Sequence, residues 1–201
     1  MHVQTEDWRT ADRGVVITGS AGRIGRLLMK ALPGAIGLDL PACDLSTVTP
    51  QLPEGARVVA LAAHPDGCGS YETAWAANTA IFTNTVRACI QARARCLVFA
   101  SSVWVEHRAW SLSDTLTWYA AAKHAGELLC RAWAEACPDR TAVALRIGGY
   151  DPDIPVDLSC RVDGETLTEA FQAALNLHAP GFLVRYAVGT KSTWEIGRDE
   201  R

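Results

Sequence analysis

Two short motifs contain the groups in this chain that could do chemistry. TGSAGRIG, at residues 18–25, is a glycine turn after an apolar run, and its backbone could approach a pyrophosphate closely. YAAAK, at residues 119–123, places a phenol and an ammonium one helical turn apart, on the same face of a helix. The ammonium would lower the pKa of the phenol toward the range that general acid–base catalysis requires. In this order, the two motifs together indicate nicotinamide chemistry on a Rossmann-like sheet.

The glycine turn has the spacing GxxGxxG. Gly19, Gly22 and Gly25 lie between an expected strand and an expected helix. The N-terminus of that helix would offer unpaired N–H groups and a partial positive charge to a pyrophosphate. An ordinary glycine-rich turn between a strand and a helix would contain the same glycines, so the pattern alone leaves both interpretations open.

An acid at the end of the second expected strand favours nucleotide binding. Asp39 lies 20 residues after Gly19, the distance at which a carboxylate meets the ribose hydroxyls of NAD. The carboxylate would repel the additional phosphate of NADP, and the following Leu40, Pro41 and Ala42 supply no arginine to offset it. We therefore expect NAD as the cofactor. The alternative is a solvated acid at a strand end.

A hydroxyl is still needed to hold a substrate oxygen against the phenol. Ser101 and Ser102 supply it, at the end of the apolar run at residues 96–99. In an open parallel sheet, ligands bind beyond the carboxyl ends of the strands, where both the glycine turn and the serines would lie. We expect Ser102, Tyr119 and Lys123 to be catalytic, although a YxxxK pattern also arises on helices by accident.

Short apolar runs alternate with helical stretches along most of the chain. Strands are expected at about 14–18, 35–39, 57–62, 96–100 and 141–147, helices at about 23–32, 76–94, 115–136 and 163–178, and a further strand at 181–189. The alternation predicts an α/β fold, a doubly wound Rossmann-like parallel sheet with a small C-terminal substrate-side appendage. We expect residues 1–201 to form a single domain, with an NAD-binding core at 14–149 and a short substrate-side segment at 150–201.

Composition excludes several classes of protein. The 201 residues carry a formal net charge of −3, which gives no electrostatic case for nucleic acid or an anionic membrane. Seven cysteines without a CxxC pair fit buried thiols in a reducing compartment better than disulfides, and the histidine spacing gives no metal site. No apolar run has the length of a membrane span, and the N-terminus lacks a signal-peptide core. We expect a cytoplasmic protein without a metal.

These motifs resemble those of the extended short-chain dehydrogenase/reductase family, also called the NAD-dependent epimerase/dehydratase family, over about residues 14–197. The resemblance implies catalytic roles for Ser102, Tyr119 and Lys123. It also implies that the glycines contact pyrophosphate, Asp39 the ribose and Asp44 with Leu45 the adenine. The cofactor-binding residues are then Gly19, Ala21, Gly22, Arg23, Ile24, Gly25, Asp39, Leu40, Asp44, Leu45, Leu61, Ala62, Ala63, Asn78, Tyr119, Lys123, Ile147 and Gly148.

Within this family, residues 18–26, 145–149 and 188–197 look most similar to uronate dehydrogenases, which oxidise the anomeric carbon of a hexuronate with NAD. The substrate contacts implied are His64, Ser102, Val103, Trp104, Gly149 and Arg161, with Arg161 as the candidate to bind a carboxylate. Val103 and Trp104 replace the polar pair of those enzymes and the acidic pair of the dehydratases, which disfavours dehydration. The segment after Gly149 looks shortened, so we expect a smaller or more open substrate pocket, or one closed by a partner subunit.

The expected reaction is reversible hydride transfer between NAD and a carbinol carbon of a small polar substrate, of sugar-acid or aldose type. Two alternatives remain: an epimerase-like enzyme that retains its NAD and shows no net redox, and an NAD-binding protein without redox turnover. The helices at about 76–94 and 115–136 lie where this family pairs its subunits, so the resemblance also implies a homodimer.

Overall fold

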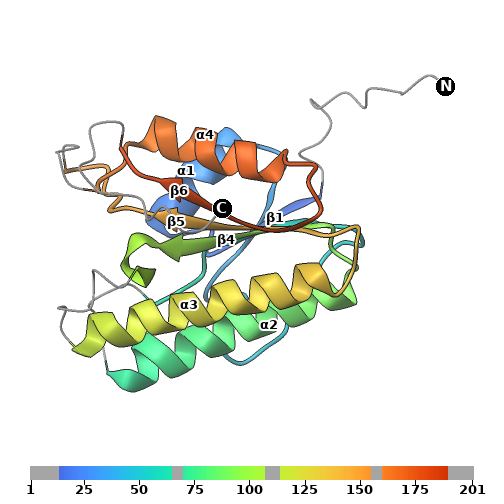
Figure 1. Ribbon diagram of the computed structural model, residues 1–201, viewed down its shortest axis with the longest axis horizontal. Coiled ribbons are helices and arrows are strands. Elements are labelled where there is room, and N and C mark those ends of the chain that lie inside the picture. The colour runs from blue at the N-terminus through green and yellow to red at the C-terminus, as the bar shows by residue number, and fades with distance from the viewer. Residues whose placement is uncertain (1–13, 65–69, 107–113, 155–159, 190–201) are drawn as a thin grey trace.

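The structure is a computed structural model that describes residues 14–64, 70–106, 114–154 and 160–189, with the side chains of 114–116 outside that description. A parallel sheet lies between two layers of helices (Figure 1). The strands are β1 (Val15–Thr18), β2 (Ile36–Leu38), β3 (Arg57–Ala60), β4 (Cys96–Ser102), β5 (Thr141–Ile147) and β6 (Gly181–Ala187). The helices are α1 (Arg23–Ala31), η2 (Glu72–Ala77), α2 (Asn78–Gln91), η3 (Val103–Val105), α3 (Asp114–Glu135) and α4 (Gly164–Leu175).

The strand order is β2-β1-β3-β4-β5-β6, and all neighbouring pairs are parallel. After β1 the chain moves to one side of the sheet through α1 and β2, and then returns to the other side to form β3. The order therefore reverses beside β1, and ligands of open α/β sheets bind in the crevice beyond the strand ends at such a point. Helices α1 and α4 cover one face, and α2 and α3 cover the other (Figure 1).

The four central strands, β1, β3, β4 and β5, are almost fully buried between the helical layers, whereas β2 and β6 at the edges of the sheet are partly exposed. Val15 and Ile17 pack under α1 and α4, together with Phe171 of α4. Val16 and Leu97 point to the opposite face and pack in a second cluster under α2 and α3. Alternation of side chains along each strand thus divides the core into two layers and holds the carboxyl ends of the strands in one plane.

The prediction of a doubly wound Rossmann-like parallel sheet is confirmed, and the strands and helices lie within a few residues of their expected positions. The π-helix at Glu72–Ala77, directly before α2, was not predicted. Residues 164–187, which we assigned to a segment outside the nucleotide-binding core, form α4 and β6. Strand β6 pairs with β5 over seven residues, so this part of the chain extends the sheet itself.

Replacement of Phe171 by alanine tests whether α4 belongs to the main core. Phe171 is fully buried among residues of β4, β5 and α4. We expect Phe171→Ala to lower the free energy of unfolding by about 3–5 kcal/mol, because a large cavity remains. Glu169→Ala, at an exposed position of the same helix, is the control and should change it by less than about 0.5 kcal/mol. Urea unfolding of both variants measures this, and equal stabilities would show that α4 is peripheral.

Candidate active site

The glycine turn between β1 and α1 leaves no room for a side chain at Gly19 or Gly25. Gly19 has φ +73°, and a Cβ there would lie 2.7 Å from the backbone nitrogen of Ala62. A Cβ at Gly25 would lie 2.1 Å from the carbonyl oxygen of Gly19. Both glycines are therefore required by close approach of the backbone to itself, which brings the turn against the segment after β3.

The N-terminus of α1 has the character of an anion site. Its N-cap residue is Gly22, which contributes no side-chain hydrogen bond to the first turn, and the first turn contains no acidic residue. The unpaired N–H groups and the helix dipole of such a terminus favour phosphate oxygens. Two predicted cofactor residues in this turn have other contacts: the guanidinium of Arg23 lies 3.1 Å from the Asp151 carboxylate, and Ile24 packs against the core.

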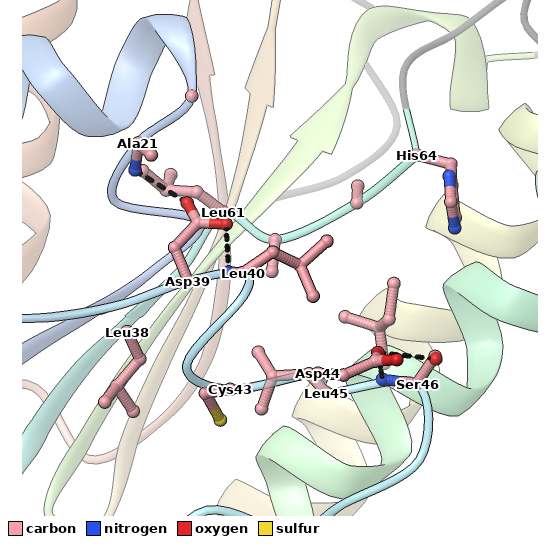
Figure 2. A pocket seen from close by; sticks show the side chains of 15 residues that line it. Ala21, Leu38, Asp39, Leu40, Cys43, Asp44, Leu45, Ser46, Leu61 and His64 are labelled. Carbon is pink, nitrogen blue, oxygen red and sulfur yellow. Dashed lines mark hydrogen bonds between the residues drawn. The ribbon is translucent and has the colours of Figure 1, made fainter.

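Asp39, directly after β2, is held by two backbone amides. Its Oδ2 accepts a hydrogen bond from the amide of Ala21 at 2.6 Å, and its Oδ1 accepts one from the amide of Leu40 at 2.7 Å (Figure 2). The carboxylate is thus fixed beside the glycine turn, where sequence spacing had predicted it. A carboxylate oxygen has a second lone pair, so these bonds leave acceptor capacity for a ribose hydroxyl.

A cavity of about 430 Å³ extends from the glycine turn along the ends of β2 and β3 (Figure 2). The predicted cofactor residues that line it are Gly19, Ala21, Gly22, Asp39, Leu40, Asp44, Leu45, Leu61, Ala62 and Ala63. His64, which we expected on the substrate side, also lines it, and so do Leu38, Cys43, Ser46 and Ile81, which sequence reasoning missed. These four come from β2, the following loop and α2, and no motif marks them because only the fold brings them together.

Two carboxylates, Asp39 and Asp44, are among the polar residues that line the cavity. The hydroxyl and the amide of Ser46 donate hydrogen bonds to Asp44 and lower the pKa of its carboxyl group, so it is ionised at neutral pH. None of the described residues that line the cavity is a lysine or an arginine. Asp39 and Asp44 would therefore repel a 2′-phosphate, and the cavity suits the adenosine half of NAD better than that of NADP.

The side chain of Asn78 holds in place a segment that lines the cavity. Its Oδ1 accepts a hydrogen bond from the backbone amide of His64 at 2.8 Å, and its Nδ2 donates one to the carbonyl of Ala74 at 3.0 Å. The buried amide therefore ties the segment after β3 to the π-helix, which is a helix form often found at functional sites. The expected contact of Asn78 with the cofactor stays a prediction; in the structure its side chain holds His64, which lines the cavity.

The two serines at the end of β4 make different hydrogen bonds. Ser101 donates its hydroxyl hydrogen to the buried carboxylate of Glu127. Ser102 instead caps η3, because its Oγ accepts a hydrogen bond from the amide of Trp104 at 3.3 Å. A hydroxyl that accepts a bond still has a proton to donate, so the geometry favours Ser102 over Ser101 as the group that holds a substrate oxygen.

Tyr119 and Lys123 lie on α3 next to the end of β4. Lys123 is 5% exposed, and its ammonium donates to the carbonyl of Ala100 at 2.7 Å and lies 5.4 Å from the centre of the Tyr119 ring. The ring of Trp104 makes an edge contact with that of Tyr119, at 6.2 Å between centroids. The beginning of α3 and the ends of β4, β5 and β6 lie at the same end of the molecule (Figure 1). The fold thus brings the three predicted catalytic residues to one edge of the sheet.

A second glycine contact allows this approach of α3 to the sheet. A Cβ at Gly126 would lie 2.4 Å from the ring of Phe99 on β4. Glycine at this position lets the helix pack directly on the aromatic ring, and the Phe99 ring lies 5.1 Å from the Lys123 ammonium. The burial of Lys123 beside β4 follows from this packing.

The predicted substrate residues are only partly suited to contact a ligand. Val103 is 1% exposed and packs in the core, so it presents no surface to a substrate. Trp104 is half-buried beside Tyr119 and can form an apolar wall. Arg161 lies beside Gly149, where a Cβ would be 3.9 Å from its Nη1, and the amide of Val162 donates to the Gly149 carbonyl at 3.0 Å. The structure therefore brings Arg161 to the end of β5.

Two predicted cofactor residues, Ile147 and Gly148, lie at that strand end and are closely packed. Ile147 is buried in the core beneath α4. Gly148 donates its amide to the carbonyl of Ala187 on β6, and a Cβ there would lie 1.6 Å from the carbonyl oxygen of Cys160. Only glycine fits at position 148, because any side chain would overlap Cys160, the residue before Arg161.

A cluster that sequence reasoning missed lies next to the predicted catalytic residues. We call it the buried charge cluster; its members are Ser101, Glu106, Glu127, Arg146 and Tyr186. The guanidinium of Arg146 donates to both oxygens of Glu127, from Nε at 3.0 Å and from Nη2 at 2.9 Å. Its Nη1 donates to the Tyr186 hydroxyl at 2.9 Å, and that hydroxyl donates to Glu106. Two features of the sequence could have indicated this cluster. One is a glutamate four residues after Lys123, and the other is an arginine in a buried strand.

Burial and neighbouring charges determine the protonation of this cluster. Burial alone would lower the pKa of Arg146, but the hydrogen bonds and charge of Glu127, with a contribution from Tyr186, raise it well above its ordinary value. Burial and the hydrogen bond to Glu106 raise the pKa of Tyr186 to about 12. The guanidinium is therefore charged and the phenol neutral throughout the physiological range.

Within the described residues, no group of His, Cys, Asp and Glu side chains is arranged to hold a metal ion. The same part of the chain contains no helix that is long and apolar enough to cross a membrane. The segment at 188–197, one of those that resembled uronate dehydrogenases, lies mostly outside the described residues.

The chain was compared with protein families and with known proteins. The model of the NAD dependent epimerase/dehydratase family matches residues 15–149, which is more than half of the chain. Among curated proteins, none matches. Among solved structures, 561 chains match.

Three of these structures illustrate the likeness. Uronate dehydrogenase from Agrobacterium tumefaciens has a TM-score of 0.72 at 20% identity, over 91% of this chain and 80% of that one. A mutant of that enzyme complexed with NAD has a TM-score of 0.72 at 18% identity, over 91% and 80%. A UDP-galactose 4-epimerase has a TM-score of 0.62 at 20% identity, over 87% and 76%. At these identities the likeness supports the fold alone.

Alkylation of Cys43 tests the cavity. Burial and the Asp44 carboxylate raise the pKa of this thiol, so iodoacetamide labelling is best followed near pH 9, by peptide mass spectrometry. With NAD at ten times its dissociation constant, we expect the labelling rate of Cys43 to fall about tenfold, because bound NAD covers the residue. Cys137, which is also half-buried but outside the cavity lining, is the control and should react at an unchanged rate. Equal rates at Cys43 with and without NAD would place the cofactor elsewhere.

Proposed function

Since the chain belongs to the NAD-dependent epimerase/dehydratase family, and is an NAD-dependent enzyme of the extended short-chain dehydrogenase/reductase type, we propose that it transfers a hydride between NAD and a carbinol carbon of a small sugar acid or aldose. The observation that supports the proposal is that Tyr119 and Lys123 of α3 lie at the end of β4, next to Trp104 and Ala100, near Ser102 in the same strand. These residues lie at the same edge of the sheet as the cavity beside the glycine turn.

The cavity and the glycine turn fit the cofactor. The uncapped N-terminus of α1 suits a pyrophosphate, and Asp39 stands where ribose hydroxyls could donate to it. Leu45, Leu61 and Ile81 provide apolar surface for an adenine ring. NAD, when bound, supplies the hydride acceptor or donor.

The protein's own residues would then orient the substrate and move one proton. In the oxidative direction, Tyr119 as phenolate would take the proton of the substrate hydroxyl, while Ser102 donates a hydrogen bond to the same oxygen. The buried Lys123 ammonium would stabilise the phenolate, and, with its three donors, could bind a ribose hydroxyl in addition to the carbonyl of Ala100. In the reductive direction, Tyr119 would return this proton to the substrate oxygen.

Arg161 supports the choice of a sugar acid. It is a half-buried arginine beside Gly149, at the strand end where the substrate would lie, and a guanidinium binds a carboxylate through two parallel hydrogen bonds. Trp104 would provide an apolar wall for a sugar ring. A neutral aldose could pack against Trp104 but would have no carboxylate for Arg161 to bind.

An epimerase-like reaction is the second candidate. It would oxidise and re-reduce one substrate while NAD stays bound, so no NADH would be released. A UDP-galactose 4-epimerase shares the fold, which is compatible with this reading. The third reading, an NAD-binding protein without turnover, requires that Ser102, Tyr119 and Lys123 meet without catalytic use.

We also propose a homodimer, formed through the outer faces of α2 and α3. Ile90 on α2 and Leu128 and Leu129 on α3 are exposed, Leu128 by 56%. Exposed apolar side chains on two adjacent helices suit a symmetric helix–helix interface. The buried free thiols Cys89 and Cys130 support a reducing compartment, for which we propose the cytoplasm.

The reaction is tested by NADH formation from NAD with a panel of free uronates, aldoses and nucleotide sugars. We expect turnover confined to one class of free sugar, and we expect Tyr119→Phe to lose it by a factor of about 10² or more, since general acid–base catalysis contributes 10²–10⁴. NAD affinity of Tyr119→Phe, measured by calorimetry, should stay nearly unchanged. Activity retained in the mutant would contradict the role of Tyr119. Product isomers without NADH would instead favour the epimerase reading.

Removal of the Arg161 charge tests the substrate class. We expect Arg161→Met to raise the KM for a uronate about 10- to 100-fold, because a charge-assisted pair is worth about 1.5–3 kcal/mol, and to leave the KM for the matching aldose nearly unchanged. Arg185→Met, at an exposed position of β6, is the matched control and should change neither KM. Equal losses for the acid and the aldose would show that Arg161 supports the loop and does not bind the carboxylate.

A further inference from the structure

The buried charge cluster contains a rigid connection between helix α3 and strand β5. Glu127 and Arg146 are each 4% exposed, and the guanidinium meets both carboxylate oxygens at 2.9–3.0 Å. A bidentate pair of this kind determines the relative orientation of the two groups as well as their distance, because the guanidinium is planar. The pair therefore sets how α3 lies against the sheet.

The remaining members extend this connection to the neighbouring elements. Ser101 of β4 donates to the same Glu127 oxygen that accepts from Arg146 Nε. Tyr186 of β6 accepts from Arg146, and its hydroxyl donates to Glu106 at the end of η3. Side-chain hydrogen bonds thus connect β4, α3, β5, β6 and the end of η3 in one chain, with the Arg146 guanidinium at its centre.

Four members of the cluster, all except Tyr186, are close in the chain to residues of the proposed site. Ser101 precedes Ser102 in β4, and Glu106 ends the short helix that Ser102 caps. Glu127 follows Lys123 by one turn of α3, so the two side chains share a face of the helix. Arg146 precedes Ile147 at the end of β5. A shift of the cluster would therefore move the hydroxyl, the phenol and the ammonium relative to one another.

The cluster also has an excess of negative charge. Two carboxylates surround one guanidinium, and Tyr186 is neutral because its pKa is about 12. The buried Lys123 ammonium lies one turn away on α3 and complements this excess. Stability alone does not require this arrangement, because well-packed apolar side chains in place of a buried ion pair are often as stable or more so.

We infer that Glu127 and Arg146 are positioning residues for the hydride-transfer site, which hold α3 against β4 and β5 so that Ser102, Tyr119 and Lys123 keep one reactive geometry. This inference rests on the proposed function. It assigns the pair no contact with substrate or cofactor. Weakening the pair should therefore slow the chemical step more than it weakens NAD binding, because the cavity lies along the ends of β2 and β3, and β4 separates β3 from the strand β5 that carries Arg146.

Three variants weaken the cluster to different degrees. Arg146→Lys keeps the charge and loses the planar fork, Glu127→Gln keeps the shape and loses the charge, and Tyr186→Phe removes one hydroxyl while its ring stays in place. For the first two we expect kcat to fall about 10- to 100-fold, because a small misplacement of reacting groups has an effect of this size. NAD affinity should change less than about threefold, as for an interaction that is made mainly in the transition state. Tyr186→Phe should show the same pattern with a smaller loss, and it remains informative if the other two fold poorly.

Arg140→Lys is the matched control. This arginine precedes the same strand β5 at its opposite end, where its guanidinium lies 4.9 Å from the Trp133 ring and donates to the Trp133 carbonyl. All variants are assayed well below their melting temperatures, with the folded fraction measured by circular dichroism. The substrate deuterium isotope effect on kcat should rise in the cluster variants and stay unchanged in Arg140→Lys, which a loss of stability alone would not produce.

The outcomes separate the two proposals. If Tyr119→Phe is inactive and the cluster variants lose no more kcat per folded molecule than Arg140→Lys, the positioning role is wrong and the proposed function stands. A proportional loss of kcat and NAD affinity in the cluster variants would also overturn the positioning role. If Tyr119→Phe remains active, the proposed function fails, and the positioning role fails with it.

Discussion

The parallel pairing of β1 with β2 on one side and with β3 on the other determines where a dinucleotide can lie in this protein. Parallel strands need crossovers, so every strand ends at the same edge of the sheet, and the reversal of order beside β1 opens a crevice there. The glycine turn, Asp39 and the segment after β3 all occupy that crevice. Substitution of Gly19 or Gly25 would separate them, because the backbone contacts leave no volume for a side chain.

A second constraint acts on the other side of the edge, where charge is buried. Lys123, Glu127 and Arg146 are nearly inaccessible to water, and each has hydrogen-bond partners that offset its desolvation. The close contact of Gly126 with Phe99 brings α3 near enough to the sheet for these bonds to form. The predicted acid–base residues Tyr119 and Lys123 therefore lie beside buried charge in a region of low dielectric, in which electrostatic effects on a phenol are stronger than in water.

The comparisons establish the family and the fold, whereas substrate specificity depends on the chain's own side chains. The family match establishes an NAD-dependent enzyme of the short-chain dehydrogenase/reductase type, and structures at about 20% identity share the fold over most of the chain. On the proposed substrate side, Val103 is buried, Trp104 lies against Tyr119, and Arg161 lies beside Gly149. Substrate specificity must therefore be argued from these side chains.

The sequence by itself determined the class of fold, the order of its elements and the two motifs. These depend on local patterns, namely apolar runs, glycine spacing and the helical period, which short-range sterics impose. Only the tertiary structure decided that Ser101 bonds Glu127 while Ser102 caps η3, that the Asn78 side chain holds His64, and that β6 continues the main sheet. It also revealed Glu106, Arg146 and Tyr186 as neighbours. These contacts join residues far apart in the chain, and no local pattern specifies which of many possible partners a buried polar group will meet.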